Sequence, residues 1–145
     1  MAESPPAEQS DIRWKQRFDN LQRAHRRLLW ALEIEQQDPE NDLIRIAVIK
    51  AYEFTFELSW KTLKDFLAYN GIDAKLPREV LKQAFATGLI RDGQLWIDML
   101  EERNLMAHTY NDTRARQAVR LIQERYLAGL QQLHDLFSAK LEESR

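Results

Sequence analysis

The central part of the chain reads LIRIAVIKAYEFTFELSWKTLKDFLAY, residues 43–69, and contains neither glycine nor proline. Its apolar residues recur three or four positions apart, which places side chains on one face of an α-helix. The expected buried stripe comprises Ile46, Ile49, Tyr52, Phe56, Trp60, Leu63 and Leu67. Phe54, Leu58 and Phe66 add apolar surface on other faces. The pattern predicts one long helix contacted from two sides, by its own bundle and by another chain.

A helix of similar length is predicted upstream of the central one. Its apolar positions follow helical spacing: Trp14, Phe18, Leu21, His25, Leu28, Leu29 and Leu32. The segment QQDPEND, which contains Pro39, ends this helix, and Asn41 or Asp42 caps the central one. The pair Asn70-Gly71 then stops the central helix.

Three further helices are predicted in the second half of the chain. A short helix is expected over residues 77–87, because proline is favoured at the first helical position and Gly88 follows as a stop. The next helix runs over about residues 92–106, and the segment HTYND interrupts it. Asp112 or Thr113 then caps a last helix that continues to the end. Its expected buried residues are Val119, Ile122, Tyr126, Leu130, Leu133 and Phe137.

The composition favours an all-α protein. Four glycines and four prolines in 145 residues leave little material for the turns of an all-β fold. The expected architecture is an up-and-down four-helix bundle with one additional short helix, formed by a single domain over residues 11–145. Residues 1–10, MAESPPAEQS, are expected to be a disordered tail, because Pro5 and Pro6 stand among small polar residues.

The composition also excludes several kinds of chemistry. The chain has no cysteine, so disulfides, thiolate catalysis and cysteine-ligated zinc are excluded. With only three histidines, neither a metal site nor another cofactor is expected. The net charge of −2 argues against a broadly basic, nucleic-acid-coating surface but permits a local cationic site. No signal peptide and no apolar run of about 20 residues is present, which predicts a cytoplasmic protein without membrane contact.

The least ordinary segment is RNLMAHTY, residues 103–110. At about 100° per residue, Arg103 projects from the middle of the apolar stripe around Met99, where an unpaired guanidinium is costly. On an unbroken helix His108 lies about 140° away from Arg103. Either the helix ends between them, or a site combines Arg103 and His108 from two copies of the chain. Asn104 shares a helix face with His108 and can orient its imidazole.

An arginine and a histidine, without metal ligands or a nucleophilic serine or cysteine, suit chemistry on phosphate. The guanidinium donates a fixed fork of hydrogen bonds to phosphate oxygens, and the imidazole transfers protons near neutral pH. RNA carries its own nucleophile, the 2′-hydroxyl. A protein that deprotonates this hydroxyl and neutralises the phosphorane can therefore cleave RNA without a metal.

These residues resemble a known family. Arg103-Asn104-x-x-x-His108 is similar to the R-x(4–6)-H signature of HEPN domains, small helical bundles many of which are metal-independent ribonucleases. With Tyr110 the segment also resembles the R-x4-H-x-Y form of HepT-like toxins paired with minimal nucleotidyltransferases. The stretch KAYEFTFELSWKTLKDFL, residues 50–67, is similar to the second helix of proteins called nucleotidyltransferase substrate-binding. The resemblance covers about residues 12–140.

The resemblance implies an endoribonuclease toxin that forms a homodimer, with Arg103 and His108 of both subunits lining one cleft. Arg103 would bind and polarise the RNA phosphate, His108 would act as acid or base, and Asn104 would support them. Tyr110 would accept AMP from a cognate minimal nucleotidyltransferase antitoxin. Adenylylation adds a negative phosphate and a bulky base, which would repel and block RNA.

Simpler interpretations of the same residues remain open. Arg103 can form an interior ion pair with Glu57 or Glu53 of the central helix. His108 can be a helix-terminal histidine stabilised by the helix dipole. Tyr110 can pack its ring in a turn and hydrogen-bond its hydroxyl. None of these interpretations needs a catalytic site.

Two wider alternatives concern the surface and the whole chain. Six arginines form two basic groups that either hold phosphates or make solvated helix faces: Arg23, Arg26, Arg27, Arg114, Arg116 and Arg120. Instead of a ribonuclease, the chain can be a non-catalytic subunit that presents a nucleotide or substrate to a nucleotidyltransferase. It can also be a purely structural helical adaptor.

Overall fold

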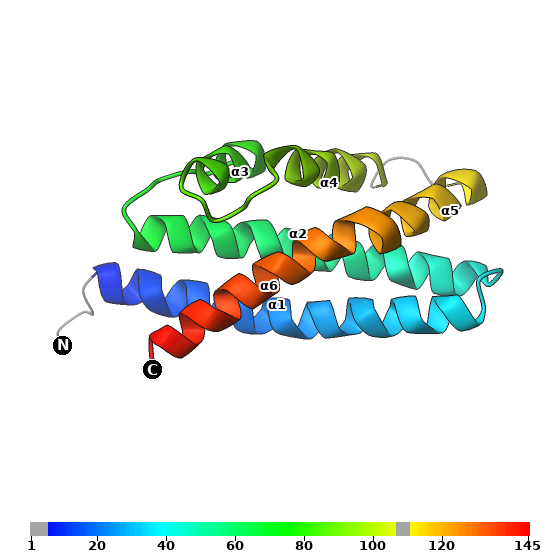
Figure 1. Cartoon of the computed structure of the whole chain (residues 1–145), viewed down its shortest axis with the longest axis horizontal. Helices are drawn as coiled ribbons and strands as arrows, with labels where there is room; N and C mark the ends of the chain where they lie inside the picture. The colour runs from blue at the N-terminus through cyan, green and yellow to red at the C-terminus, as the bar shows by residue number, and fades with distance from the viewer. Residues whose placement is uncertain (1–5, 107–110) are drawn as a thin grey trace.

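The computed structural model describes residues 6–106 and 111–145, and within these ranges the regular secondary structure is all helical. Two long antiparallel helices, α1 (Pro6–Gln37) and α2 (Asp42–Tyr69), lie side by side (Figure 1). The helices α3 (Pro77–Ala86) and α4 (Gly93–Met106) pack on α2. The last run consists of α5 (Asp112–Leu121), the π-helical turn η1 (Ile122–Tyr126) and α6 (Leu127–Glu143), and crosses the α1–α2 pair obliquely (Figure 1). The predicted up-and-down bundle is confirmed.

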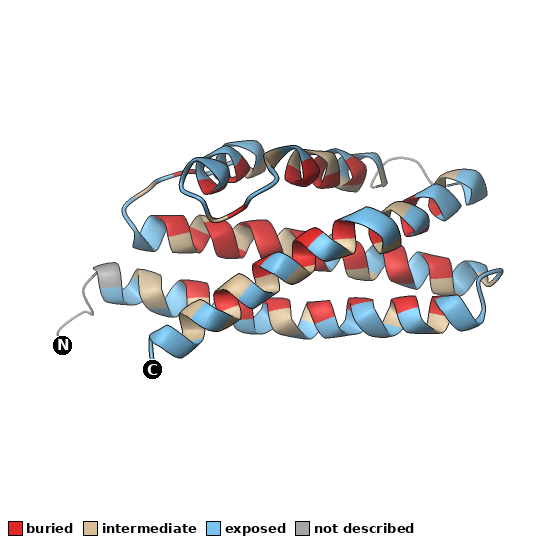
Figure 2. Ribbon diagram, in the orientation of Figure 1, coloured by how far each residue is buried: buried red, intermediate tan, exposed pale blue. Residues whose placement is uncertain are grey.

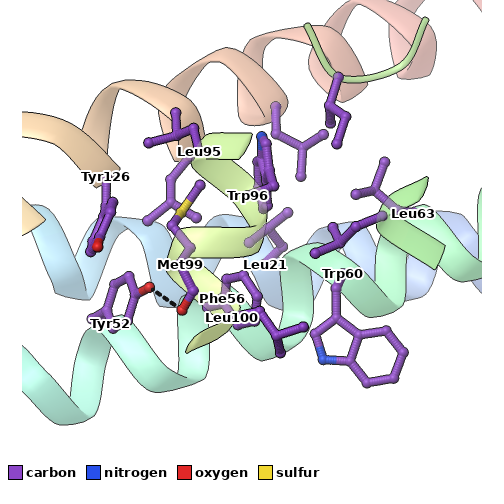
Figure 3. Packing of buried hydrophobic residues seen from close by; sticks show 14 of the residues in the cluster. Leu21, Tyr52, Phe56, Trp60, Leu63, Leu95, Trp96, Met99, Leu100 and Tyr126 are labelled. Carbon is purple, nitrogen blue, oxygen red and sulfur yellow. Dashed lines mark hydrogen bonds between the residues drawn. The ribbon is translucent and has the colours of Figure 1, made fainter. Parts of the chain in front are cut away.

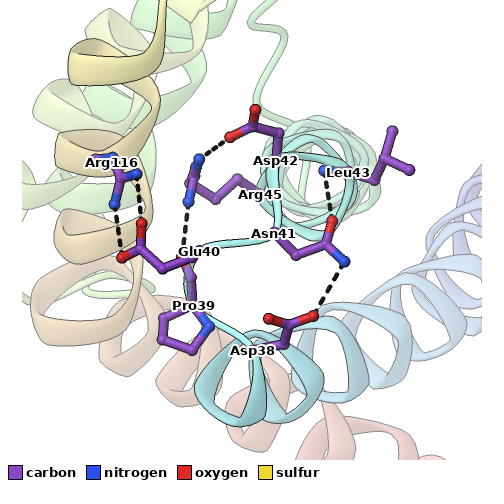
Figure 4. Close-up of polar contacts among 8 residues, drawn as sticks. All are labelled: Asp38, Pro39, Glu40, Asn41, Asp42, Leu43, Arg45 and Arg116. Atoms are coloured by element: carbon purple, nitrogen blue, oxygen red, sulfur yellow. Dashed lines mark hydrogen bonds and ion pairs between the residues drawn. The ribbon is translucent and has the colours of Figure 1, made fainter.

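The predicted signals at the ends of α2 and α3 have the expected geometry. The Asn41 side-chain oxygen accepts a hydrogen bond from the backbone N–H of Leu43 at 3.0 Å, and its amide donates to Asp38 at 3.1 Å (Figure 4). Gly71 and Gly88 follow α2 and α3 with φ of 83° and 80°. Glycine adopts this left-handed conformation without a steric penalty, so both helices stop there.

Hydrogen bonds and an ion pair join the turn between α1 and α2 to α5. The buried Arg45 donates to the Pro39 carbonyl at 2.7 Å and pairs with Asp42 (Figure 4). Arg116 of α5 donates two hydrogen bonds to Glu40, at 3.2 and 2.9 Å. These hydrogen bonds, together with the positive charge of Arg116, hold the pKa of the Glu40 carboxyl below its usual value. The sequence placed Arg116 among the arginines that either hold phosphates or make a solvated helix face. In the structure it forms an ion pair with Glu40 of the same chain.

The predicted disordered tail over residues 1–10 is wrong for residues 6–10, which form the first turns of α1. Proline fits the first position of a helix because its missing N–H would have no helical partner there. Further along, Trp14 and Lys15 both donate to the Asp11 carboxylate at 2.8 Å, which stabilises the start of the helix. Residues 1–5 lie outside the described residues.

The predicted burial of Ile46 and the predicted cap of the last helix are also wrong. Ile46 is 45% exposed, and Leu29, which follows the apolar spacing of α1, is 40% exposed, because the face of each helix that a neighbour covers is narrower than the apolar stripe. Asn111, rather than either of the two residues after it, caps α5, and its side chain accepts a hydrogen bond from the Arg114 backbone N–H at 2.9 Å.

One core lies between all the described helices, to which α1 and α3 also contribute, and the buried residues face inward on each helix (Figure 2). The hydroxyl of the fully buried Tyr52 donates to the Met99 carbonyl of α4 at 2.8 Å, and its ring stacks on Tyr126 at 5.8 Å (Figure 3). A Cβ atom at Gly129 of α6 would lie 2.8 Å from Leu95 Cδ2, so the absence of a side chain allows α6 to approach α4 closely. None of the described helices is long and apolar enough to cross a lipid bilayer.

Candidate functional site

Arg103 lies in the last turn of α4, where it contacts α2. Its Nε and Nη2 donate to Glu57 Oε2 at 3.2 and 2.7 Å. Its Nη1 donates to the side-chain oxygen of Asn104 at 2.7 Å. Of the two carboxylates considered as partners, Glu57 forms the ion pair, while Glu53 contacts Lys50 at 3.5 Å. The structure therefore confirms that Arg103 has an intrachain partner.

The Arg103–Glu57 pair is accessible to water. The side chains of Arg103 and Glu57 are 25% and 33% exposed, and Lys61 approaches the second oxygen of Glu57 at 3.6 Å. Arg103 thus projects from the edge of the apolar stripe rather than from its buried middle. Because the guanidinium keeps contact with solvent, its desolvation cost is smaller than the helical wheel indicates.

A second ion pair joins the end of α4 to the start of α5. Glu102 is buried and accepts a hydrogen bond from Arg114 Nη2 at 2.7 Å. The other Glu102 oxygen and the Arg114 Nε are buried without a hydrogen-bond partner among the described residues. Sequence reasoning missed this pair, because the two residues are twelve positions apart and lie on different helices.

Two tyrosines, Tyr52 and Tyr126, lie close to Glu102 at this end of α4. Burial raises the pKa of Tyr52 well above its usual value, and the neighbouring Tyr126 and Glu102 raise it further. Burial, followed by the charge of Glu102, also raises the pKa of Tyr126. Both phenols therefore stay protonated near neutral pH. Neither is a candidate base, and the Tyr52 hydroxyl is committed to the Met99 carbonyl.

Of the four predicted site residues, the structure brings Arg103 and Asn104 into direct contact. His108 and Tyr110 lie outside the described residues. The helix α4, which precedes residues 107–110, is joined to α2 through Arg103 and to α5 through Glu102. The other two histidines of the chain, in α1 and α6, stack on each other at 4.8 Å.

The arrangement suits recognition of a phosphate. A guanidinium presents five N–H groups, and Arg103 uses three nitrogens in the contacts with Glu57 and Asn104. The remaining donors and the partial exposure leave room for an anionic ligand at the end of α4. Glu57 and Asn104 hold the planar group in one orientation, which is the arrangement that bidentate phosphate binding needs.

Comparison with known proteins links the whole bundle to one family. The family model described as nucleotidyltransferase substrate binding protein like matches residues 16–139. The probable ribonuclease HepT of Haemophilus influenzae is 32% identical over 79 residues, which are 51% of this chain and 54% of that protein. The chain thus matches about half the length of this curated relative.

Two solved structures have a similar fold. A protein of Thermus thermophilus is 31% identical, with a TM-score of 0.66, over 76% of this chain and 94% of that one. The tri-AMPylated HEPN toxin of Shewanella oneidensis, solved in complex with an MNT antitoxin, is 16% identical, with a TM-score of 0.71, over 87% and 96% of the two chains. At that identity the second likeness concerns the fold alone.

Proposed function

Because the chain belongs to the nucleotidyltransferase substrate-binding-like family and has the HEPN fold, we propose that it is a metal-independent endoribonuclease toxin of a toxin–antitoxin pair. The observation that carries this proposal is the position of Arg103. It begins the R-x4-H-x-Y segment, and Glu57 and Asn104 orient it while part of its side chain stays exposed. A relative named as a probable ribonuclease supports the same activity.

In the proposed reaction the RNA 2′-oxygen attacks the adjacent phosphorus. The 2′-hydroxyl proton passes to His108 or to water, the leaving 5′-oxygen takes a proton from water or from His108 in turn, and the bond from phosphorus to that oxygen breaks. The products are a 2′,3′-cyclic phosphate and a free 5′-hydroxyl. Arg103 stabilises the negative charge that develops on the phosphorus oxygens, and Asn104 keeps the guanidinium in place through the 2.7 Å hydrogen bond.

We further propose that the active form is a homodimer with one shared cleft. The helix α4 ends at Met106, so it carries Arg103 but not His108, and we propose that the two residues reach one phosphate from different subunits. A two-fold axis near the end of α4 would bring Arg103 of each subunit close to His108 of the other. The partial exposure of Arg103 is compatible with this arrangement.

The proposed switch is transfer of AMP to Tyr110 by a cognate minimal nucleotidyltransferase antitoxin. The new phosphodiester adds negative charge within seven residues of Arg103 in sequence, and the adenosine adds bulk. Both effects oppose binding of an RNA phosphate to the same segment. The AMPylated HEPN toxin among the structural neighbours motivates this proposal.

Cleavage of RNA by the purified chain in a chelator tests the proposed activity. The wild-type chain should cleave, and His108→Ala should lower the rate by about 100-fold or more, because general acid–base catalysis contributes that much. The matched control is His134→Ala, which removes a partly exposed histidine that pairs with Asp135 in α6. If the wild-type chain leaves RNA intact, or if both alanine variants cleave equally well, the proposed activity is lost.

A second candidate is a non-catalytic subunit that presents a nucleotide or substrate to a nucleotidyltransferase. The description of the matching family favours this candidate. Calorimetric titration with ATP and AMP separates the two functions. Nucleotide binding without any RNA turnover would support this candidate over the ribonuclease.

A further inference from the structure

An apolar groove runs along the surface between α1 and α2, with a volume of about 640 Å³. Two aromatic side chains stand beside it, Trp30 of α1 and Phe54 of α2, and they are 64% and 59% exposed. Most of the other lining residues are aliphatic, and four of them are alanines: Ala24, Ala31, Ala47 and Ala51. Small residues flanked by large exposed rings make a groove that can receive the side chains of another helix.

The charged residues that line the groove are all cations: Arg23, Arg27 and Lys50. Arg23 pairs with Asp19 and Lys50 pairs with Glu53 at 3.5 Å, and neither carboxylate lines the groove. Lys50 also lies 5.7 Å from the ring of Phe54. Arg27 has no carboxylate within ion-pair distance among the described residues. Asp19 and Glu53 each offset one cation, so Arg27 carries the unbalanced positive charge of the groove, which favours an acidic ligand.

We propose that this groove binds an amphipathic helix of a partner protein, with an apolar stripe flanked by carboxylates. The apolar side chains of that helix fill the space over the alanines, between Trp30 and Phe54. Its carboxylates pair with Arg23, Arg27 and Lys50. In a second copy of this chain the same groove is lined by the same cations, so like charges would meet in a symmetric contact.

The lining also distinguishes a protein helix from RNA. Aromatic rings and arginines suit stacked bases and phosphates, but base edges need hydrogen-bond partners when they are buried. Asn20 is the only uncharged polar side chain among the described residues that line the groove. The cations can donate hydrogen bonds to a base, but among the lining side chains only Asn20 can accept one from a base amino group, so a base inserted over the alanine floor would lose hydrogen bonds to water. An apolar side chain loses none, so a helix is favoured.

The position of the groove suggests which protein contributes the helix. Phe54 is three residues before Glu57, so the two are neighbours on the surface of α2, and Glu57 binds Arg103. A protein seated in the groove is therefore beside the proposed catalytic segment. We assign the helix to the nucleotidyltransferase partner, and this assignment rests on the proposed function.

Binding of the full chain to the purified nucleotidyltransferase, measured by calorimetry, tests the groove. Trp30→Ala and Phe54→Ala should each weaken the complex by about 30-fold, the usual effect of removing a central aromatic anchor. Reversing charge with Arg27→Glu should weaken it by about tenfold or more at low salt. Phe85→Ala and Lys82→Glu are the matched controls, because both residues are exposed on α3, away from the groove, and should leave affinity unchanged.

A photo-crosslinker identifies the occupant directly, since the chain contains no cysteine and Ala47→Cys gives a single thiol in the groove. The expected crosslink is to a partner peptide with helical apolar spacing and flanking carboxylates, and Ala139→Cys in α6 should not form it. A crosslink to a second copy or to RNA, or unchanged affinity of both aromatic variants, would overturn the groove assignment. RNA cleavage by the same variants shows separately whether the proposed function holds, because it requires no partner.

Discussion

Replacement of Arg103 by methionine separates a structural ion pair from a phosphate-binding group. Arg103 and Glu57 are 25% and 33% exposed and their closest atoms are 2.7 Å apart. Water screens an ion pair that is exposed to this extent, so the pair contributes about 0–1 kcal/mol to the free energy of unfolding. Methionine also retains much of the aliphatic packing of the arginine stem. We therefore expect Arg103→Met to change the free energy of unfolding by less than about 1 kcal/mol.

The same substitution should have a much larger effect on catalysis. Removal of one donor to a developing oxyanion lowers turnover by about 100- to 1000-fold. The two quantities are measured on the same protein, by urea unfolding followed with circular dichroism and by RNA cleavage in a chelator. Arg125→Met is the matched control. Arg125 pairs with Asp98 at the same 2.7 Å distance and is 44% exposed, so its loss should cost similar stability and leave cleavage intact.

Two results would refute this reasoning. A loss of more than about 3 kcal/mol in Arg103→Met would show that the pair behaves as a buried one and that Glu57 is left with an uncompensated charge. Unchanged cleavage by a folded Arg103→Met chain would favour the structural adaptor. In that case the R-x4-H-x-Y resemblance would not reflect a ribonuclease site.

Three further predictions concern stability. Gly129→Ala should destabilise the fold by about 1–3 kcal/mol in thermal unfolding, because the new methyl group would lie 2.8 Å from Leu95. Tyr52→Phe should cost about 1 kcal/mol in urea unfolding without changing RNA cleavage, because it removes the hydrogen bond to Met99. Burial and the stacked histidine of α6 lower the pKa of His25 below 6.5, so the unfolded chain binds the proton more readily. Stability should therefore fall as the pH drops through about 6.5, and His25→Phe should remove this dependence.

Helix positions were predictable because their signals are local. Each helix needs only a cap, a stop and apolar spacing, and these are read from neighbouring residues such as Asn41, Gly71 and Gly88. Side-chain exposure depends on which neighbour covers each face. Leu29 and Ile46 have apolar neighbours at helical spacing, yet no helix packs closely over them among the described residues. Tertiary packing therefore decided the positions that periodicity assigned incorrectly.

The candidate site was predictable in its residue types and less so in its contacts. The sequence suggested a partner for Arg103 from α2, since Glu53 and Glu57 are both on that helix, and the crossing of α2 and α4 selected Glu57. The Glu102–Arg114 pair depends on the direction in which α5 packs relative to α4. No local sequence pattern specifies that direction. The α1–α2 groove likewise exists only after two helices are packed together.

The ion pair and the site are compatible interpretations of Arg103. Glu57 binds Nε and Nη2, and Asn104 binds Nη1, so three of the five N–H donors are engaged. The two remaining donors suffice for a bidentate contact with phosphate, and the fixed orientation lowers the entropy lost when that contact forms. If Glu57 positions the guanidinium, Glu57→Gln should weaken cleavage when Arg103 is present and have no added effect in Arg103→Met. If the pair is only structural, the two substitutions should alter stability alone, and cleavage should follow the folded fraction.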